Sequence, residues 1–541
     1  MVFSSPEFVL GFLPVVFALY LLVQRYLGRV RTIQLLVAAS LIFYGWWHPR
    51  YILLIGGSIV FNWLVSRHLH RGHQRRGLVL AFGVVCNVLL LGYFKYTSFL
   101  IENANWIVGA QWDLAHIVLP LAISFFTFQQ IAYLVDSYSG DTSRYRFQEY
   151  ALFIVFFPQL IAGPIVHHTE MLTQFCKSDA FRFRLANLSI GLTAFSIGLF
   201  KKVVLADNLG AVADPVFATA SDGSPLAFFD AWVGALAFFL QVYFDFSGYS
   251  DMALGLARMF GIRLPLNFNS PYKARNIIDF WQRWHITLTR FLVDYIYSPL
   301  TLIYMRKGVL AGDGRVRLFV RAVIVPVFVV FLVSGLWHGA GWTFVIWGMF
   351  HFVGMATVRS WQEAKLPLLP YPVAWFLTMS LVLTSLVFFR ASSIPAAFAV
   401  LDSMFGGGNI HIPRSLQDVL PVLTHFTDLP RFRIVFTDGN LFFTDRLVVT
   451  SPRSALFYIL SGGAICLLLP NCAELLARFN PVVDRRMPAW TAPVWIVGAM
   501  HRIVAWRPSV AWSATVAVMF AISLTFMLRT DATRQFIYFQ F

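Results

Sequence analysis

Charged residues are scarce in this chain. Only 13% of its 541 residues are charged and 58% are hydrophobic, whereas about a quarter of the residues in soluble domains are charged. This deficit excludes a soluble globular protein. A bilayer core about 30 Å thick needs roughly 20 apolar residues per helix, and such runs recur between residues 8 and 528. The sequence therefore predicts an all-α, multi-pass membrane protein with about ten to twelve spans.

Cysteine is also rare, and two common catalytic or structural motifs are missing. The four cysteines, Cys86, Cys176, Cys466 and Cys472, form no CxxC pair, which argues against a disulfide framework or a cysteine zinc site. No GxSxG elbow for a nucleophilic serine is present. The N-terminus lacks a basic segment and a small-x-small cleavage site, so we expect its first apolar run to remain as a span.

The net charge of +16 is distributed over loops. A nucleic-acid-binding protein would gather its Lys and Arg on a polar domain, and no such domain is evident, so we expect no nucleic acid partner. Arginines instead cluster at residues 25–31 and 67–76, whereas the loops between these are poor in charge. The positive-inside tendency places these two loops in the cytoplasm. The N-terminus is therefore predicted outside the cytoplasmic membrane.

The chain is predicted to form one transmembrane domain, residues 1–541, with no internal repeat. Residues 263–299 are interpreted as an amphipathic or re-entrant segment, and residues 406–453, which mix Gly, Pro, Asp and Thr, as an extramembrane loop. Residues 156–170 are apolar but interrupted by Pro and Gly, which requires burial or a wet cavity at membrane depth. Four early helices are followed by spans predicted near 117–137, 187–205, 226–244, 319–337, 340–358, 371–390, 454–470 and 510–528.

His338 lies in the apolar stretch VFLVSGLWHGAGWTFVIWGMFHF, residues 330–352. A continuous helix from Arg321 to Arg359 would be about 57 Å long, too long for a single crossing. The chain must break, and the glycines around His338 are where it can. An ionisable group at such a break is a functional candidate. The alternative is that His338 only ties two helix ends together.

A neutral imidazole in a partly dry site can take a proton from a hydroxyl that attacks an acyl carbon and then return it to the leaving group. A metal site would be a different use of histidine. His167 and His168 could join His338 as ligands, but no spacing and no Cys or Glu cluster supports this. We therefore predict no metal, and adjacent loop histidines near a headgroup surface are the simpler interpretation of His167 and His168.

A helical wheel drawn from Arg275 places His285 on an apolar face. The charged residues Arg275, Asp279, Arg283, Arg290 and Asp294 fall in one arc and form i,i+4 pairs of opposite sign. His285 falls in the opposite arc with Trp281 and Trp284. A core histidine held by a carbonyl is the structural alternative to a catalytic group here.

Weaker candidates surround these histidines. Asp245 and Asp251 lie with Ser247, Tyr249 and Ser250 near Gly248 at the end of an apolar run. They could orient a histidine or act indirectly on donor phosphates, or they could cap helix ends. Asn267, Asn269, Lys273 and Arg275 form a polar and basic lead-in that could meet the phosphates of coenzyme A or anchor at the membrane surface.

Several segments together resemble the membrane-bound O-acyltransferase (MBOAT) superfamily, specifically its bacterial alginate O-acetylation branch. WQRWHITLTRFLVDYIYSPL (281–300) is followed by SGLWHGAGWTFVIWG (334–348). FFPQLIAGPI (156–165), QVYFDFSGYSDMALGLARMFGI (241–262), LNFNSPYKARNIIDFW (266–281), VFFRASS (387–393) and FIYFQF (536–541) are also similar. Residues 406–453 and 480–508 do not align with the pattern.

The resemblance implies that His338 is the catalytic histidine and His285 the second histidine of the site, with Trp281, Trp284 and Trp337 as candidate tunnel-lining residues. It also implies a ring of tilted helices around a thin centre, with a tunnel from a cytoplasmic donor, acetyl-CoA, to an acceptor outside. The implied partners are the lipid bilayer, the acyl-CoA donor and a periplasmic SGNH-type or acyl-carrying protein. No tightly bound cofactor is implied, and the implied location is the bacterial inner membrane.

The implied activity is O-acetylation of an exported polysaccharide such as alginate or cellulose. Peptidoglycan O-acetylation and D-alanyl transfer are alternatives within the family. A transporter or a scaffold for an acylated substrate is the alternative from another class. Transporters usually have two related halves with matching helix breaks, and no second copy of the WHGA break is present. A scaffold would leave His338 dispensable.

Overall fold

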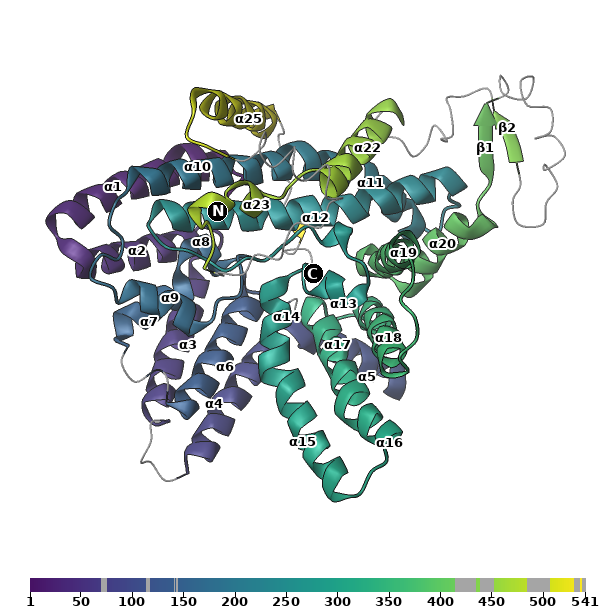
Figure 1. Ribbon diagram of the computed structural model, residues 1–541, viewed down its shortest axis with the longest axis horizontal. Coiled ribbons are helices and arrows are strands. Elements are labelled where there is room, and N and C mark those ends of the chain that lie inside the picture. The colour runs from purple at the N-terminus through teal and green to yellow at the C-terminus, as the bar shows by residue number, and fades with distance from the viewer. Residues whose placement is uncertain are drawn as a thin grey trace.

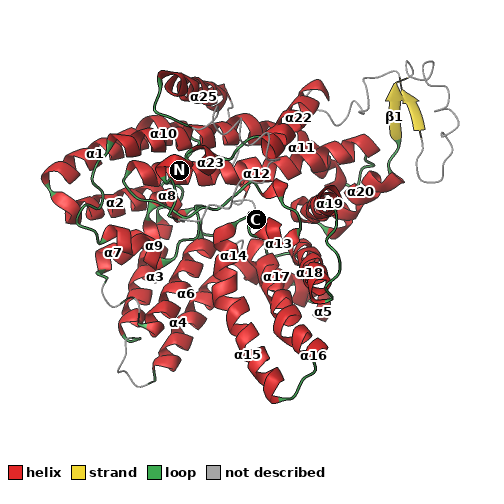
Figure 2. Ribbon diagram, viewed as in Figure 1, coloured by secondary structure: helices red, strands yellow, loops and turns green. Residues whose placement is uncertain are grey.

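The protein was analysed as a computed structural model. The structure describes residues 1–69, 75–112, 117–140, 142, 145–413, 434–437, 452–483, 506–529 and 536–537. These are almost entirely helical, apart from two short parallel strands, β1 (Ile410–Pro413) and β2 (Ile434–Thr437) (Figure 2). Most of the predicted loop 406–453 and of segment 480–508 lies outside the described residues.

Most helices of the first part of the chain lie at the upper left and lower left of Figure 1, whereas α5 (Thr97–Val108) lies at the lower right. Several helices continue through π-helical turns, which are labelled η, so one continuous helix can have both an α label and an η label. The elements are η1 (Glu7–Phe12), α1 (Leu13–Tyr26), α2 (Gly28–Gly45), α3 (Arg50–Arg67), α4 (Arg76–Leu91), η2 (Gly92–Tyr96), α5 (Thr97–Val108), α6 (Ile123–Ser139), α7 (Phe147–Val155), α8 (Phe157–Leu160) and α9 (His168–Phe175).

The second part contains a central pair of helices, with the candidate-site helices at the lower right of Figure 1. The central elements are α10 (Leu185–Phe200), η3 (Lys201–Ala206), α11 (Asp207–Ser221) and α12 (Phe228–Met259). The site elements are the 3-10 turn η4 (Pro271–Lys273), α13 (Ile277–Trp281), α14 (Ile286–Leu292), η5 (Val293–Tyr297), α15 (Ser298–Leu310), α16 (Arg315–Phe319), η6 (Val320–Ile324), α17 (Val325–His338), α18 (Trp342–Glu363) and α19 (Tyr371–Arg390). They are followed by α20 (Ile394–Asp402), η7 (Ser403–Gly407), α22 (Pro452–Leu468), α23 (Cys472–Leu475), the 3-10 turn η9 (Ala477–Phe479) and α25 (Val510–Arg529).

Seven helices in the described part of the chain are long and apolar enough to cross a bilayer. They are Glu7–Tyr26, Arg76–Val108, Leu185–Ser221, Phe228–Met259, Arg315–His338, Tyr371–Arg390 and Val510–Arg529. This is fewer than the sequence predicts, partly because the spans expected near 117–137 and 454–470 become helices of 17 residues, α6 and α22. The multi-pass membrane character is confirmed.

The centre of the fold is the contact between α10 and α12, which run side by side across the upper half of Figure 1. A Cβ atom at Gly191 would lie 2.6 Å from the carbonyl oxygen of Gly255, and one at Gly198 would lie 2.5 Å from that of Gly248. Only glycine allows two helix backbones this close. The two helices therefore form a tight scaffold.

Two buried ion pairs lie beside these glycines. Lys201 Nζ is 2.6 Å from Asp251 Oδ2, and Lys202 Nζ is 2.7 Å from Asp245 Oδ1. Both aspartates lie inside the 32-residue helix α12, not at the end of a span. The alternative that they cap helix ends is therefore wrong, and both carboxylates pair with lysines from a different span.

Both ends of the described chain contact the same residue of α12. The rings of Phe3 and Phe536 lie 4.7 Å and 4.8 Å from the ring of Tyr249. The backbone N–H of Ile537 donates to Asp245 Oδ2 at 2.8 Å. The segment around Phe536 is thereby held against the central helix.

Candidate functional site

His338 is the last residue of α17, and α18 begins four residues later at Trp342. A Cβ atom at Gly335 would lie 2.5 Å from the carbonyl oxygen of Phe344, and one at Gly348 would lie 2.4 Å from that of Phe331. These glycines let α17 and α18 pack closely after the turn. The predicted break at His338 is confirmed.

The His338 side chain is buried among aromatic rings. It is 4% exposed. Its ring centroid lies 4.9 Å from that of Trp337, 4.8 Å from that of Trp347 and 5.3 Å from that of Phe389. Such an apolar enclosure favours the neutral imidazole, which is the form able to accept a proton.

The carbonyl end of α17 is capped by side chains that the sequence reasoning missed. Lys95 Nζ donates to the carbonyl oxygens of Trp337 and His338, at 2.5 Å and 3.1 Å. The hydroxyl of Tyr96 donates to the Leu336 carbonyl oxygen at 2.8 Å. Both side chains come from η2. A lysine inside the apolar run LLLGYFKY was the available signal.

His285 lies at a backbone break, where the sequence predicted a continuous helix. Its φ of 43° is in the left-handed region, and the residue separates α13 from α14. A helical wheel assumes a uniform 100° per residue, so it could not detect this turn. The buried, apolar setting that the wheel predicted is nevertheless confirmed, because His285 is 0% exposed.

Asn267 holds the imidazole of His285. Its Oδ1 lies 3.0 Å from His285 Nδ1 and also accepts from the hydroxyl of Thr287 at 2.9 Å. An amide oxygen in this position requires the proton on Nδ1, which leaves Nε2 as the basic nitrogen of the ring. Burial lowers the pKa of His285 to about 3. The imidazole is therefore neutral at physiological pH.

Trp337 contacts both histidines. Its ring centroid is 6.0 Å from that of His285 and 4.9 Å from that of His338. The structure thus brings together three predicted site residues that come from separate elements, α17 and the turn before α14. This shared aromatic contact defines the candidate site.

A further buried histidine near the site, His351 of α18, was not predicted. It is 1% exposed and its Nε2 lies 3.1 Å from Ser385 Oγ. Its ring packs against Trp347 at 4.7 Å and Trp281 at 5.1 Å. Trp281 therefore faces His351, whereas the wheel placed it beside His285. The signal was a single His in an apolar helix, the same signal that singled out His338.

Two pockets flank His338. One of about 90 Å³ is lined by His338, Trp337, Lys95, Ser124 and the chain entering α6. The other, about 20 Å³, is lined by Trp284, Trp347, His351 and Phe389. A water needs about 10–15 Å³ on this measure, so the second pocket has room for about one water, whereas the first has room for a larger group beside the imidazole.

The basic lead-in does not reach either pocket. Lys273 Nζ donates to the Leu469 carbonyl oxygen at 2.8 Å. The exposed Arg275 stacks near the ring of Tyr371 at 5.9 Å. Of the weaker candidates around the predicted helix, Asn267 lies directly at the site, through His285.

The predicted charge pairs of the amphipathic segment are only partly present. Arg283 Nε contacts Asp279 Oδ1 at 2.6 Å. Arg290 instead makes a two-point contact with Glu170 of α9, at 2.6 Å and 2.8 Å, so the predicted partner Asp294 is wrong. The long-range partner provides two parallel hydrogen bonds, a stronger geometry than a surface i,i+4 pair.

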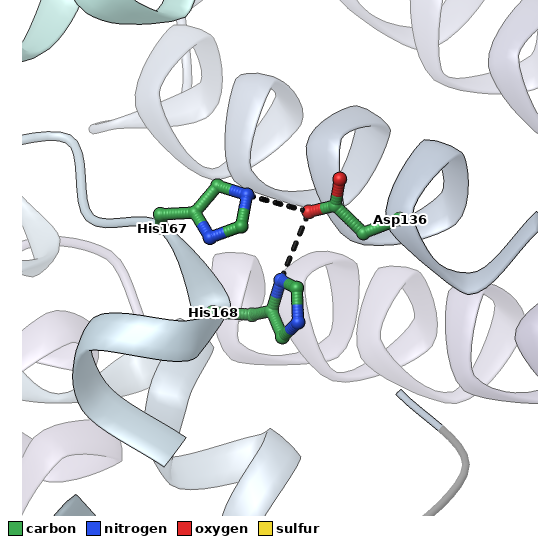
Figure 3. A group of neighbouring side chains, drawn as sticks. All are labelled: Asp136, His167 and His168. Atoms are coloured by element: carbon green, nitrogen blue, oxygen red, sulfur yellow. Dashed lines mark hydrogen bonds and ion pairs between the residues drawn. The ribbon is translucent and has the colours of Figure 1, made fainter. Parts of the chain in front are cut away.

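His167 and His168 meet Asp136 (Figure 3). His167 Nε2 and His168 Nδ1 both lie 2.9 Å from Asp136 Oδ2, and Tyr295 donates its hydroxyl to the same carboxylate at 3.0 Å. Burial lowers the pKa of His167, but Asp136 and Glu170 together outweigh it, so the net shift is upward. These hydrogen bonds join α6, α9 and η5, and His338 is not a member of the group.

Comparison with known proteins gives a consistent result. Residues 111–364, which include both site histidines, match the model of the membrane-bound O-acyltransferase family. The peptidoglycan O-acetyltransferase of Helicobacter pylori is 42% identical over 79% of this chain and 84% of its own length. The "Probable alginate O-acetylase AlgI" of Pseudomonas aeruginosa is 34% identical over 100% of both chains. The teichoic acid D-alanyltransferase of Streptococcus thermophilus is 27% identical over 45% of this chain.

Proposed function

The chain belongs to the membrane-bound O-acyltransferase family and is an O-acyltransferase, and we propose that it moves an acetyl group across the membrane for O-acetylation of an exported polysaccharide. The donor is a cytoplasmic thioester, acetyl-CoA. The observation that supports this most directly is the pair of buried histidines that both contact the ring of Trp337, with His338 beside a pocket.

His338 acts as the general base. It takes the proton of the attacking hydroxyl, and after the carbon–sulfur bond breaks it returns a proton to the leaving thiolate. His285 is the second acid–base group, and its Nε2 is basic because Asn267 fixes the proton on Nδ1. General acid–base help of this kind contributes about 100-fold to 10,000-fold. Holding donor and acceptor together supplies a further part of the rate.

The size of the pocket supports a short acyl group. About 90 Å³ beside His338 accommodates an acetyl unit but not a long acyl chain. A separate periplasmic partner of the SGNH or acyl-carrying type then passes the acetyl group to the polymer. The arginine distribution supports an inner-membrane location with the N-terminus in the periplasm.

Peptidoglycan is the second candidate acceptor. The specific observation in its favour is the 42% identity to the Helicobacter pylori peptidoglycan O-acetyltransferase, higher than the 34% identity to the Pseudomonas aeruginosa alginate relative. Alginate or a similar exopolysaccharide is favoured by the latter's coverage of the whole chain. A transporter or scaffold that only handles an acylated substrate would leave His338 dispensable.

The test is ester-linked acetate on both the exopolysaccharide and the peptidoglycan of the cell. Wild type, a deletion strain and the deletion strain expressing His338→Ala are compared, with the amount of protein in the membrane measured by blot. His48→Ala is a matched control because His48 is exposed. We expect His338→Ala to match the deletion on one polymer. Full acetylation in His338→Ala would refute the mechanism and favour a scaffold.

A further inference from the structure

Among the described residues that line the 90 Å³ pocket beside His338, Lys95 is the only cation. It lies in η2 at the end of an apolar helix, and its Nζ contacts the carbonyl oxygens of Trp337 and His338. The last carbonyl groups of a helix lack partners within the helix and carry partial negative charge. A lysine there is favourable, and it also fixes the ammonium within reach of the His338 backbone.

These two contacts use two of the N–H donors of the ammonium group. An ammonium has three N–H donors, and the part of the chain that the structure describes supplies acceptors for two of them. No carboxylate in that part forms an ion pair with Lys95. A hydroxyl such as that of Tyr96, which caps Leu336, could have satisfied carbonyls without placing a charge here.

The pocket that Lys95 lines has further features that suit a developing negative charge. The first turn of α6, including Ser124, forms part of its wall, and the N-terminus of a helix is its positive end. Trp337 also lines the pocket. Its indole Nε1 is buried and has no hydrogen-bond partner among the described residues. A donor, a cation and a helix N-terminus therefore lie around one small space.

We propose that Lys95 is the electrophilic group of the acyl-transfer centre and that its third N–H binds the oxygen of the thioester carbonyl. When the acceptor hydroxyl attacks, a carbon–oxygen bond forms and the carbonyl electrons move to that oxygen, next to the ammonium. The carbon–sulfur bond then breaks, the carbonyl reforms, and the thiolate takes the proton held by His338. No oxidant or further reactant is needed. The proposal rests on the proposed function and assigns the other half of its chemistry.

The expected contribution of such a group to kcat is large. Removing one donor that stabilises an oxyanion in a water-poor site lowers kcat by about 100-fold to 1,000-fold. Because the interaction strengthens in the transition state, the loss should appear in kcat, with little change in KM. If Lys95 only held the turn in place, its replacement would change the amount of folded protein and not the kcat of the protein that folds.

The test uses inside-out vesicles from the deletion strain expressing the full chain, with release of CoA thiol from acetyl-CoA as readout. We expect Lys95→Met to lower kcat by at least 100-fold per folded protein, with KM for acetyl-CoA within threefold of wild type. Lys95→Arg, which keeps a cation, should recover at least tenfold over Lys95→Met. Lys307→Met, at an exposed lysine of α15, is the matched control and should be unchanged.

The outcomes distinguish failure of the Lys95 assignment from failure of the proposed acetyl-transfer function. If Lys95→Met keeps kcat within threefold of wild type, or if Lys95→Arg is no better than Lys95→Met, the assignment of Lys95 is wrong. His338→Ala is measured in the same vesicles. If His338→Ala retains activity, the proposed function fails. If it loses activity while Lys95→Met retains it, only the Lys95 assignment fails.

Discussion

Two regions of this protein bury titratable groups inside a membrane domain, and they do so differently. In the central scaffold of α10 and α12, Lys201 and Lys202 are neutralised by Asp251 and Asp245. In the site, His285 and His338 are enclosed by aromatic rings, and His285 Nδ1 contacts the neutral side chain of Asn267. Paired charges fix a structure, whereas an enclosed neutral imidazole keeps a proton-accepting nitrogen available for chemistry.

The comparison predicts that a change in the site lowers activity and leaves stability intact, and the opposite result would contradict it. His338→Ala should lower acetyl transfer by at least about 100-fold, the lower bound for loss of a general base. The amount and melting temperature of the protein should stay close to wild type, because the contact that ties the end of α17 to Lys95 uses the backbone carbonyl of His338 and not its imidazole. The measurement is polymer acetate per folded protein in the membrane. A large loss of folded protein would show that His338 belongs with the scaffold.

Lys202→Met should do the reverse. Lys202 contacts Asp245 at 2.7 Å and Asp207 at 2.8 Å, and removing one partner of a buried pair costs about 3–5 kcal/mol. We expect little folded protein, measured by detergent thermal unfolding followed by size-exclusion chromatography. The control is Asp179→Asn, which removes the exposed pair with Arg184 and should cost less than about 1 kcal/mol. Equal stability of both variants would contradict the scaffold role.

Asn267→Ala should affect the site moderately. Asn267 Oδ1 accepts from the Nδ1 of His285, and an orphaned buried donor costs about 1–3 kcal/mol. We expect acetyl transfer to fall by about tenfold, because the ring of His285 is no longer held in one tautomer. Asn269→Ala, at a neighbouring amide that contacts Asn471, is the matched control. Identical losses in both would indicate a general packing defect.

The smallest effect is a change in how stability depends on pH. The pKa of His285 is lowered to about 3, whereas an unfolded histidine titrates near 6.5. Between these values the unfolded chain binds the extra proton, so stability falls as pH falls below about 6.5. His285→Gln should remove up to about 1.4 kcal/mol per pH unit of this slope. Melting temperatures at pH 7 and pH 5 provide the check, and an unaltered slope would contradict it.

Features that are determined by a single stretch of sequence could be predicted. The break at His338 follows from an apolar run too long for one crossing and from the glycines beside it. The burial of His285 follows from the wheel, although the wheel assumes a uniform helix and so misses the left-handed conformation of His285 just before α14.

Partners far apart in the sequence were not predictable in this way. Asp245 and Asp251 look like cap or site residues until Lys201 and Lys202 are found opposite them. Arg290 has a plausible partner four residues away but uses Glu170. Lys95 and His351 each lie in an apolar helix, and only the fold shows that one caps α17 and the other shares Trp347 with His338.

The contact of Phe3 and Phe536 with Tyr249 has a consequence for biogenesis. Phe3 can contact Tyr249 as soon as α12 has been inserted by the translocon. Phe536 cannot do so until it has left the ribosome, which happens only after α25 has been synthesised. Phe536 also touches Phe246, whose ring lies 4.7 Å from that of His285. The packing of Phe246, which contacts the second histidine, is therefore completed late in synthesis, so a nascent chain can be fully inserted in the bilayer while the surroundings of its reactive centre are still unfinished.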